Sequence, residues 1–181
     1  DERYQTAVKI SQAGWKNSRY AIIATGDDFP DALCAAPLAR KYNAPILLTT
    51  QSYLNSYSAA ELQRLQVSEV IIVGGTGPVS LNVESQIKAL GINVNRIAGT
   101  NRYDTSVKIA EQLGTSNQVV IATGADFPDA LSISSIAASK GMPILLTNSN
   151  SIPNEIKPYL SSHNFNNSYI IGGPGVITNT V

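Results

Sequence analysis

Two pairs of aspartates are the first candidates for chemistry in this sequence. Asp28 with Asp31, and Asp126 with Asp129, each follow a Thr-Gly dipeptide in two closely similar loops. Two carboxylates at this spacing could act as general acid and base, or bind a hard cation through oxygen. The structural alternative is that Asp28 caps a helix whose first turn holds Pro30 and Asp31. Because the pair occurs twice in one short chain, we favour local structure first, ligand or inter-module contact second, and catalysis last.

Two glycine-rich turns are the next candidates, and they contain Gly74 and Gly75 in one case and Gly172 and Gly173 in the other. The first turn has part of a dinucleotide-binding fingerprint, but the third glycine is missing, and no acidic residue for a ribose lies about 20 residues beyond Gly75. We therefore expect tight turns with anion-favouring backbone N–H groups, and no cofactor.

Three arginines lie where a helix dipole does not favour a cation. Arg3, Arg96 and Arg102 begin or precede predicted helices. Each needs another partner, which could be a carboxylate of the aspartate pairs, a cluster of carbonyl groups, or an anionic ligand held by the guanidinium fork. Tyr4 and Tyr103 follow two of these arginines and could stack on a sugar ring, although a half-buried structural role is the simpler interpretation.

Composition excludes several classes of protein. The 181 residues carry 13 Lys and Arg against 13 Asp and Glu, so the surplus of cations that nucleic-acid binding needs is absent. One Cys and one His cannot build a metal site of several thiolate or imidazole ligands. A Ser-His-Asp triad would need His163, which lies in a polar segment typical of a loop. No apolar run is long enough for a membrane span, and a signal peptide could have been removed.

The chain is a tandem repeat. Residues 24–33 and 122–131 agree at nine of ten positions with an offset of 98. The same offset places Pro-Ile-Leu-Leu-Thr at 45–49 onto 143–147, and residues 3–10 match residues 102–109 at an offset of 99. We therefore predict two copies of one module, at residues 1–98 and 99–181. The second copy stops before its final helix and strand, so we expect a piece of a longer protein or completion by a neighbour.

Each copy alternates short apolar runs with helical patterns. The runs predict buried parallel strands, because apolar residues at successive positions suit a sheet covered on both faces. Strand–helix alternation then predicts an α/β fold with helices on both faces of each sheet. Ser58 and Glu61 have the spacing of a capping box. Pro158 interrupts the predicted helix at 154–161, which we expect to be short. The predicted strands of the first copy are 20–24, 45–48, 70–73 and 94–98, and its helices are 31–42, 58–65 and about 81–90.

These motifs resemble the cell wall binding repeat 2 family, through the Arg-Ile-Ala-Gly-Thr-Asn-Arg-Tyr-Asp-Thr segment at 96–105, both Thr-Gly-x-Asp-Phe-Pro-Asp-Ala-Leu loops, both Pro-Ile-Leu-Leu-Thr runs and both Gly-Gly turns. The resemblance implies Rossmann-like (flavodoxin-like) modules that occur mainly in surface proteins of clostridia and related Gram-positive bacteria. Such repeats usually come in threes, pack with pseudo-threefold symmetry, and hold the protein non-covalently on an anionic wall polysaccharide.

The resemblance also assigns motif positions. The family's Ile-Leu-Leu element falls on Ile46, Leu47 and Leu48 and on Ile144, Leu145 and Leu146, which we expect to be core residues. Two departures matter: the chain has two repeats rather than three, and Ser106 stands where the family pattern has alanine. We therefore expect pairing with a further repeat, in the same chain or in another.

We predict a secreted, non-catalytic module that anchors a protein to the cell wall. Its expected partners are an anionic wall polysaccharide and further repeats of the family, without nucleic acid and without membrane insertion. The alternatives are a nucleotide- or small-molecule-binding enzyme fragment and a structural spacer. Residues 1–98 hold nine cations and eight anions, and 99–181 hold four and five, so local groups must recognise the polymer. The predicted ligand-binding residues are Arg3, Tyr4, Thr25, Gly26, Asp28, Asp31, Gly74, Gly75, Arg96, Arg102, Tyr103, Thr123, Gly124, Asp126, Asp129, Gly172 and Gly173.

Overall fold

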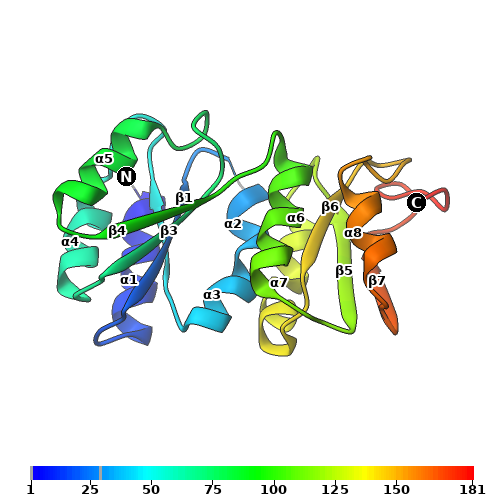
Figure 1. Ribbon diagram of the computed structural model, residues 1–181, viewed down its shortest axis with the longest axis horizontal. Helices are drawn as coiled ribbons and strands as arrows, with labels where there is room; N and C mark the ends of the chain where they lie inside the picture. The colour runs from blue at the N-terminus through cyan, green and yellow to red at the C-terminus, as the bar shows by residue number, and fades with distance from the viewer. Residues whose placement is uncertain (1, 29) are drawn as a thin grey trace.

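The computed structural model describes residues 2–28 and 30–181, which form two α/β modules side by side (Figure 1). Asp1 and Phe29, the second of which belongs to the repeated loop, lie outside the described residues. The first module contains α1 (Glu2–Gly14), β1 (Tyr20–Thr25), α2 (Pro30–Cys34), α3 (Ala36–Tyr42), β2 (Ile46–Thr49), α4 (Ser56–Arg64), β3 (Glu69–Val73), α5 (Leu81–Ala89) and β4 (Asn93–Ile97). The second contains α6 (Arg102–Leu113), β5 (Gln118–Thr123), α7 (Pro128–Lys140), β6 (Ile144–Thr147), α8 (Ile156–Ser162) and β7 (Asn167–Ile171).

Both sheets are parallel, and their strand orders correspond. The first sheet has the order β2-β1-β3-β4, and the second has the order β6-β5-β7. Ile22 pairs with Ile46 in the first sheet, and Val120 pairs with Ile144 in the second, so the register is the same in both copies. The predicted α/β fold with two tandem modules is confirmed, whereas the boundary between residues 98 and 99 stays a prediction.

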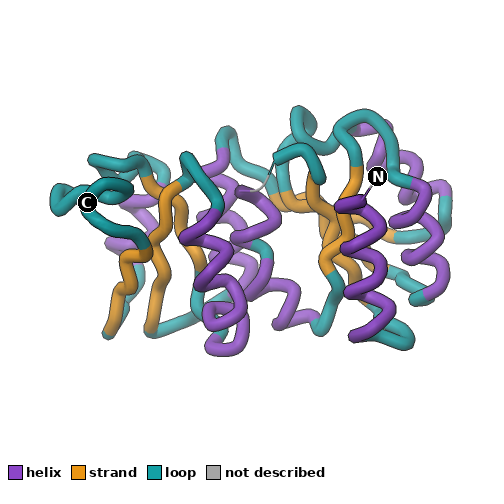
Figure 2. The backbone as a smooth tube through the Cα atoms, turned by 180° about the vertical axis from the view of Figure 1, so that it is seen from behind, coloured by secondary structure: helices purple, strands orange, loops and turns teal. Residues whose placement is uncertain are grey.

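The modules share one hydrophobic core. α2 and α3 lie between the first sheet and the second module, where they meet α6 and α7 (Figures 1 and 2). The shared cluster runs from Ile22 and Leu38 of the first module to Ile109, Ala137 and Leu146 of the second. Two further clusters, one under α1, α4 and α5 and one under α6 and α8, belong to single modules. Burial of apolar surface therefore fixes the two modules against each other.

The predicted helix at 31–42 is broken into α2 and α3 at Ala35. Pro37 is the cause, because it has no backbone N–H to donate to the carbonyl group of Leu33. Ser135 stands at the equivalent position of the second copy, and there α7 continues without a break from Pro128 to Lys140.

The predicted capping box of Ser58 and Glu61 is wrong. Asn55 caps α4 instead, and its side chain accepts a hydrogen bond from Tyr57 N at 3.0 Å. Ser58 Oγ donates to the carbonyl oxygen of Leu48 at 2.6 Å, and Glu61 accepts a hydrogen bond from Ser11 Oγ at 2.6 Å. α8 is short, as predicted, and Pro158 is tolerated in its first turn, where its N–H would have no helical partner.

Candidate functional site

Most of the predicted site residues gather at the carboxyl edges of the two sheets. In each copy the loop after the first strand packs against the start of the preceding helix. A Cβ atom on Gly26 would lie 2.6 Å from Cε1 of Tyr4, and one on Gly124 would lie 2.8 Å from Cε1 of Tyr103. Glycine is therefore required where the tyrosine ring crosses the loop. Thr25 Oγ1 supports its loop by accepting a hydrogen bond from Asp27 N at 3.1 Å, and Thr123 Oγ1 does the same for Ala125 N.

The second aspartate of each loop meets the glycine-rich turn. A Cβ atom on Gly74, whose φ is +112°, would lie 2.6 Å from Oδ2 of Asp31. The equivalent distance from Gly172 to Asp129 Oδ2 is 2.9 Å. Residues that are 43 positions apart in sequence thus form the same aspartate–glycine contact in both copies. Gly75 and Gly173 have open space where a Cβ atom would lie.

The expected helix cap is not formed in the second copy. Phe127 is the N-cap residue of α7 and makes no side-chain cap bond. Asp126 Oδ1 accepts a hydrogen bond from Phe127 N at 2.8 Å instead. Because Phe29 is not described, the corresponding cap by Asp28 lies outside what the structure tests.

The hydrogen-bond and ion-pair partners of Arg96 belong to the first module. Its Nη1 donates to the carbonyl oxygens of Gly74, Gly75 and Val79 at 2.9, 3.1 and 2.9 Å. Its Nη2 lies 3.0 Å from Oε2 of Glu84. The carbonyl cluster, one of the three partners considered from sequence, is therefore what Arg96 meets, and the guanidinium holds the glycine-rich turn in place.

The other two arginines bind a carbonyl group of the loop beside them. Arg3 donates to the carbonyl oxygen of Gly26, and Arg102 Nη1 donates to that of Gly124 at 2.6 Å. Arg102 Nη2 also lies 3.3 Å from Oδ2 of Asp28, which belongs to the first module. The Arg–Asp pair foreseen as a structural role thus joins the two modules.

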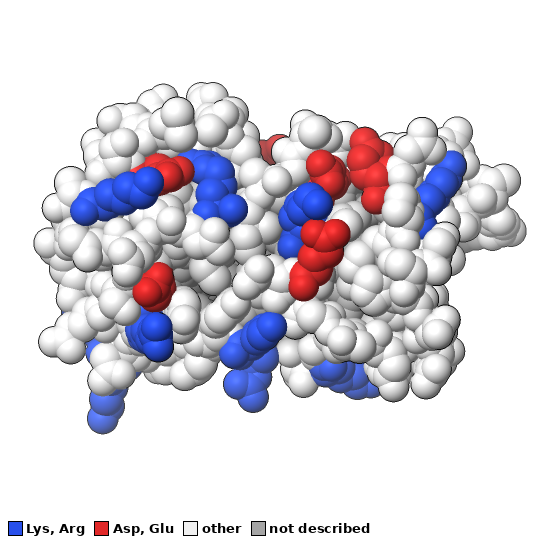
Figure 3. Space-filling view, viewed as in Figure 1, with Lys and Arg blue, Asp and Glu red and all other residues white. Residues whose placement is uncertain are grey.

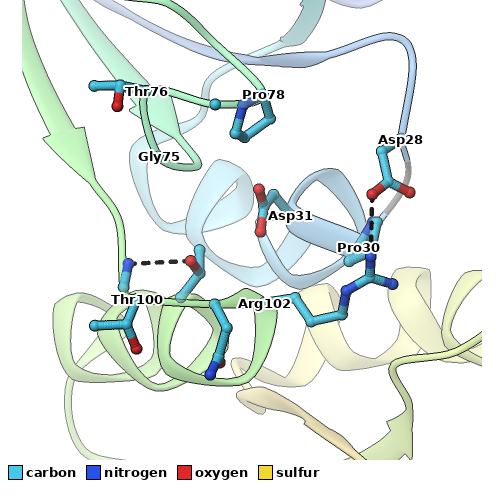
Figure 4. Close-up of a pocket in the computed structure, with 12 residues that line it drawn as sticks. Asp28, Pro30, Asp31, Gly75, Thr76, Pro78, Thr100 and Arg102 are labelled. Carbon is cyan, nitrogen blue, oxygen red and sulfur yellow. Dashed lines mark hydrogen bonds and ion pairs between the residues drawn. The ribbon is translucent and has the colours of Figure 1, made fainter.

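A pocket of about 430 Å³ opens at this junction. It is lined by the aspartate loop and the glycine-rich turn of the first module and by the start of α6 (Figure 4): Asp28, Pro30, Asp31, Gly75, Thr76, Gly77, Pro78, Gly99, Thr100, Asn101, Arg102 and Thr105. Asp31 points into the space between Pro78 and Arg102. Burial, with a smaller contribution from the Asp28 charge, raises the pKa of Asp31 to about 6. Four polar lining residues that we did not predict add hydroxyl and amide groups, and only the tertiary fold brings them to this pocket: Thr76, Thr100, Asn101 and Thr105.

The Ile-Leu-Leu elements differ between the copies. Leu47 and Leu145 are fully buried under their own helices, as expected of core residues. Ile144 and Leu146 are each 1% exposed because the first module covers them, whereas Ile46 and Leu48 are half-buried. Ile46 and Leu48 line an apolar groove of about 570 Å³ with α1, α3 and Leu131 of α7.

In residues 2–28 and 30–181, no group of three or more His, Cys, Asp or Glu side chains gathers as a metal site would require. Among the helices of these residues, none has the length and apolar character of a bilayer crossing.

Comparison with known proteins gives consistent matches over the whole chain. The sequence model of the family described as Cell wall binding domain 2 (CWB2) matches residues 1–84 and 96–181. N-acetylmuramoyl-L-alanine amidase LytC of Bacillus subtilis is 41% identical over 99% of this chain. The solved structures of Cwp6 and Cwp8 from Clostridium difficile superpose with TM-scores of 0.94 and 0.89, at 40% and 34% identity over 99% and 98% of this chain. The chain spans 36% of LytC, 29% of the Cwp6 chain and 31% of the Cwp8 chain.

Proposed function

Because the chain belongs to the Cell wall binding domain 2 family, we propose that it anchors a larger secreted protein non-covalently to an anionic polysaccharide of the cell wall. Family membership confirms a cell wall binding module and its expected location at the cell wall. The observation that carries the proposal is the match of the family to both modules, with polar junction groups between them. Since the chain spans only about a third of LytC, we assign the amidase activity in that protein's name to the part outside the match.

A non-catalytic role is supported by the surroundings of the titratable groups. His163 stacks on Tyr159 with ring centroids 4.1 Å apart, and its Nδ1 lies 2.9 Å from the carbonyl oxygen of Tyr159. His163 is the C-cap residue of α8, and these contacts involve neither aspartate pair. Asp28 is engaged by Arg102, and Asp31 packs against the Gly74 turn. These contacts suit positioning and ligand binding better than proton transfer.

The junction pocket is suited to the hydroxyl groups of a sugar. The carboxylates of Asp28 and Asp31 accept hydrogen bonds, while the guanidinium of Arg102 and the hydroxyl of Thr76 supply donors. Thr100 Oγ1 already donates to Asp104, and Asn101 Nδ2 to Glu155. Burial of the Asp31 carboxylate lowers the stability of the folded protein at neutral pH. A side chain that is kept in a pocket at such a cost is typical of a ligand-binding position. Two carboxylates against one guanidinium leave no excess of positive charge here, so the pocket contributes polar recognition rather than attraction for a polyanion.

Co-sedimentation with purified cell walls tests the anchoring function. We expect the 181-residue chain to pellet with intact walls and to remain in solution after the anionic polymer has been removed from them. Because the attraction is partly electrostatic, retention should fall as salt rises. Failure to bind intact walls, or equal binding to stripped walls, would refute the proposal.

An Arg102→Ala variant separates the two roles of this arginine, with Arg3→Ala as the matched control in the other copy. Weaker wall binding at an unchanged melting temperature would support ligand contact at the junction. A lower melting temperature with unchanged binding per folded molecule would assign Arg102 to the Asp28 contact alone.

We also propose that a third repeat docks in the apolar groove of the first module. α6 and β6 of the second module already pack against α2 and α3 of the first. The equivalent face of the first module, formed by α1 and β2, is the open groove, where Ile10 is 63% exposed. A further repeat that presents its own α2 and α3 surface would cover this groove in the same way. Three repeats joined by such contacts would form the trimer-like packing that the family resemblance implies.

A further inference from the structure

The amino edge of the sheets is poor in acidic residues although the net charge of the chain is zero, whereas both signs of charge occur at the carboxyl edge, where Arg3, Arg96 and Arg102 lie. The connections that lead into the strands, at 15–19, 43–45, 65–68, 90–92, 114–117, 141–143 and 163–166, contain no Asp or Glu. The aspartate pairs and the acidic residues of the first helical turns lie at the opposite, carboxyl edge. Figure 3 accordingly shows lysine and arginine side chains along the lower margin of the molecule and most of the acidic ones above them.

A row of cations and tyrosine rings crosses the amino edge of the first sheet. The guanidinium carbon of Arg19 lies 5.2 Å from the ring centroid of Tyr20. The Tyr20 and Tyr42 rings are 4.7 Å apart, and Lys41 Nζ lies 5.9 Å from the Tyr42 centroid. The row reaches the second module, because Gln112 donates from Nε2 to Tyr42 Oη at 2.9 Å. We call these four residues, Arg19, Tyr20, Tyr42 and Lys41, the amino-edge row.

The second copy shows that the fold does not require the amino-edge row. Asn117 and Gln118 stand at the positions of Arg19 and Tyr20, and the strand that follows has the same length and register. Ser139 and Lys140 stand at the positions of Lys41 and Tyr42, again at the end of a helix. The row therefore has a reason other than the architecture of a single module. Contact with the second module is part of that reason, because Lys41 and Tyr42 bind groups at the end of α6.

Favourable interaction with a helix dipole explains the positions of only some of the cations at the amino edge. Lys41 Nζ donates to the carbonyl oxygens of Gln112 and Leu113, both at 3.0 Å, at the end of α6, which is a favourable position for a cation. Arg19 instead lies in a connection and is exposed, with its guanidinium against a tyrosine ring. Arg40 and Lys140 are also exposed, and both line a shallow pocket of about 690 Å³ between the modules. Glu69 begins the strand beside Tyr20, and its Oε1 accepts a hydrogen bond from Asn93 at 3.3 Å.

We propose that the amino-edge row, together with Arg40 and Lys140, is a binding surface for an anionic saccharide. The guanidinium and ammonium groups hold the phosphate or carboxylate groups of the saccharide. The two tyrosine rings, each of which contacts two members of the row, fix where these cations lie. This inference rests on the proposed wall-binding function and locates it on the molecule. The anionic groups of the polymer bind at the amino edge, and its hydroxyl groups bind at the junction pocket of the carboxyl edge.

The test replaces row residues by those that the second copy already carries. An Arg19→Asn/Tyr20→Gln variant copies Asn117 and Gln118, and an Arg19→Asn/Arg40→Ala variant removes charge without touching a strand. Lys157→Ala is the matched control, because it removes one exposed cation from the first turn of α8, at the opposite edge. Each protein is titrated with three soluble probes, namely a glycerol phosphate oligomer, a hyaluronate oligosaccharide and neutral dextran, and is sedimented with purified walls. Thermal melts verify that each variant is folded.

We expect both amino-edge variants to bind walls at least about fivefold more weakly than the unaltered chain, and Lys157→Ala to bind within about twofold of it. Comparison of glycerol phosphate with hyaluronate distinguishes recognition of phosphate groups from recognition of carboxylate groups. Dextran, which has no charge, should bind weakly to both edges. Wall binding that both variants retain would overturn the inference and leave the anchoring function intact. An unaltered chain that binds the anionic oligomers through the row but not the walls would refute the anchoring function and leave the surface in place.

Discussion

Asp31 and Asp129 occupy the same position of the repeated loop but have different neighbours. Both pack against a glycine of the Gly-Gly turn. Only Asp31 also lines the junction pocket with Thr100 and Arg102 of the second module. Burial there raises the pKa of Asp31 to about 6 from its usual 3.8. At the scale of single residues, the contact between modules thus changes the chemistry of a side chain that the repeat duplicates.

This shift predicts a pH-dependent stability. Because the folded protein holds the Asp31 proton more tightly than the unfolded chain, its free energy of unfolding should fall as pH rises from about 4 to about 6. Asp31→Asn should therefore raise the free energy of unfolding at pH 7.5 by up to about 3 kcal/mol and change it little near pH 4. Urea denaturation at both pH values measures the difference.

Asp129→Asn is the control for this prediction. It removes the equivalent carboxyl group of the second module, and within residues 2–28 and 30–181 no following module packs against that side of Asp129. An Asp31→Asn effect of the same size at both pH values would assign the change to packing rather than to ionisation.

Equivalent elements of the two copies differ in what covers them. β2 and β6 have the same sequence, Ile-Leu-Leu-Thr, and the same register with the neighbouring strand. β6 is fully buried because α2 of the first module packs against it, whereas β2 has a half-buried face toward the apolar groove. The sequence of an element therefore does not set its contribution to stability.

A matched pair of truncations measures this difference. Leu146→Ala should lower the free energy of unfolding by about 3–4 kcal/mol, and Leu48→Ala by about half as much, because a cavity opens only where the side chain is surrounded. Chemical denaturation of dilute protein, below any self-association, gives both values. Equal losses would mean that the groove is closed in solution.

The contact between the modules is head-to-tail, and contacts of this type leave one complementary surface open at each end. The apolar groove, which includes Ile10 of α1, lies at one end. Leu131 of α7 lines the same groove and is 54% exposed. Exposed apolar surface that is continuous over two modules is typical of an interaction site. For the molecule as a whole, this open groove is the basis of the proposed packing with a further repeat.

We therefore expect the chain to self-associate, or to bind an added third repeat, and Ile10→Glu and Leu131→Glu to weaken this association at least about tenfold by placing a charge in the apolar groove. Leu81→Glu is the control, because Leu81 is 62% exposed on α5 and does not line the groove. Light scattering over a range of concentrations measures the association. A chain that remains monomeric and ignores an added repeat would contradict the proposed packing.

The sequence by itself determined the repeat, the α/β fold, most strands to within a residue or two, and the family. These properties depend on local patterns: apolar runs give buried strands, and motifs recur at a fixed offset. It also showed that three arginines needed partners other than the helix dipole. The choice among those partners was not local, because the carbonyl groups that Arg96 meets belong to a turn about 20 residues away in sequence, and the aspartate that Arg102 meets belongs to the other module.

Only the tertiary structure decided which copies of identical motifs are buried, where the junction pocket lies, and that the cations and tyrosines of the amino edge form one row. The physical reason is that the modules stack head-to-tail. This stacking covers Leu146 and leaves Leu48 at a groove, and it brings Tyr42 against Gln112. Charge counted along the chain is zero, but folding gathers the connections that contain no Asp or Glu at one edge, because every parallel strand begins at that edge.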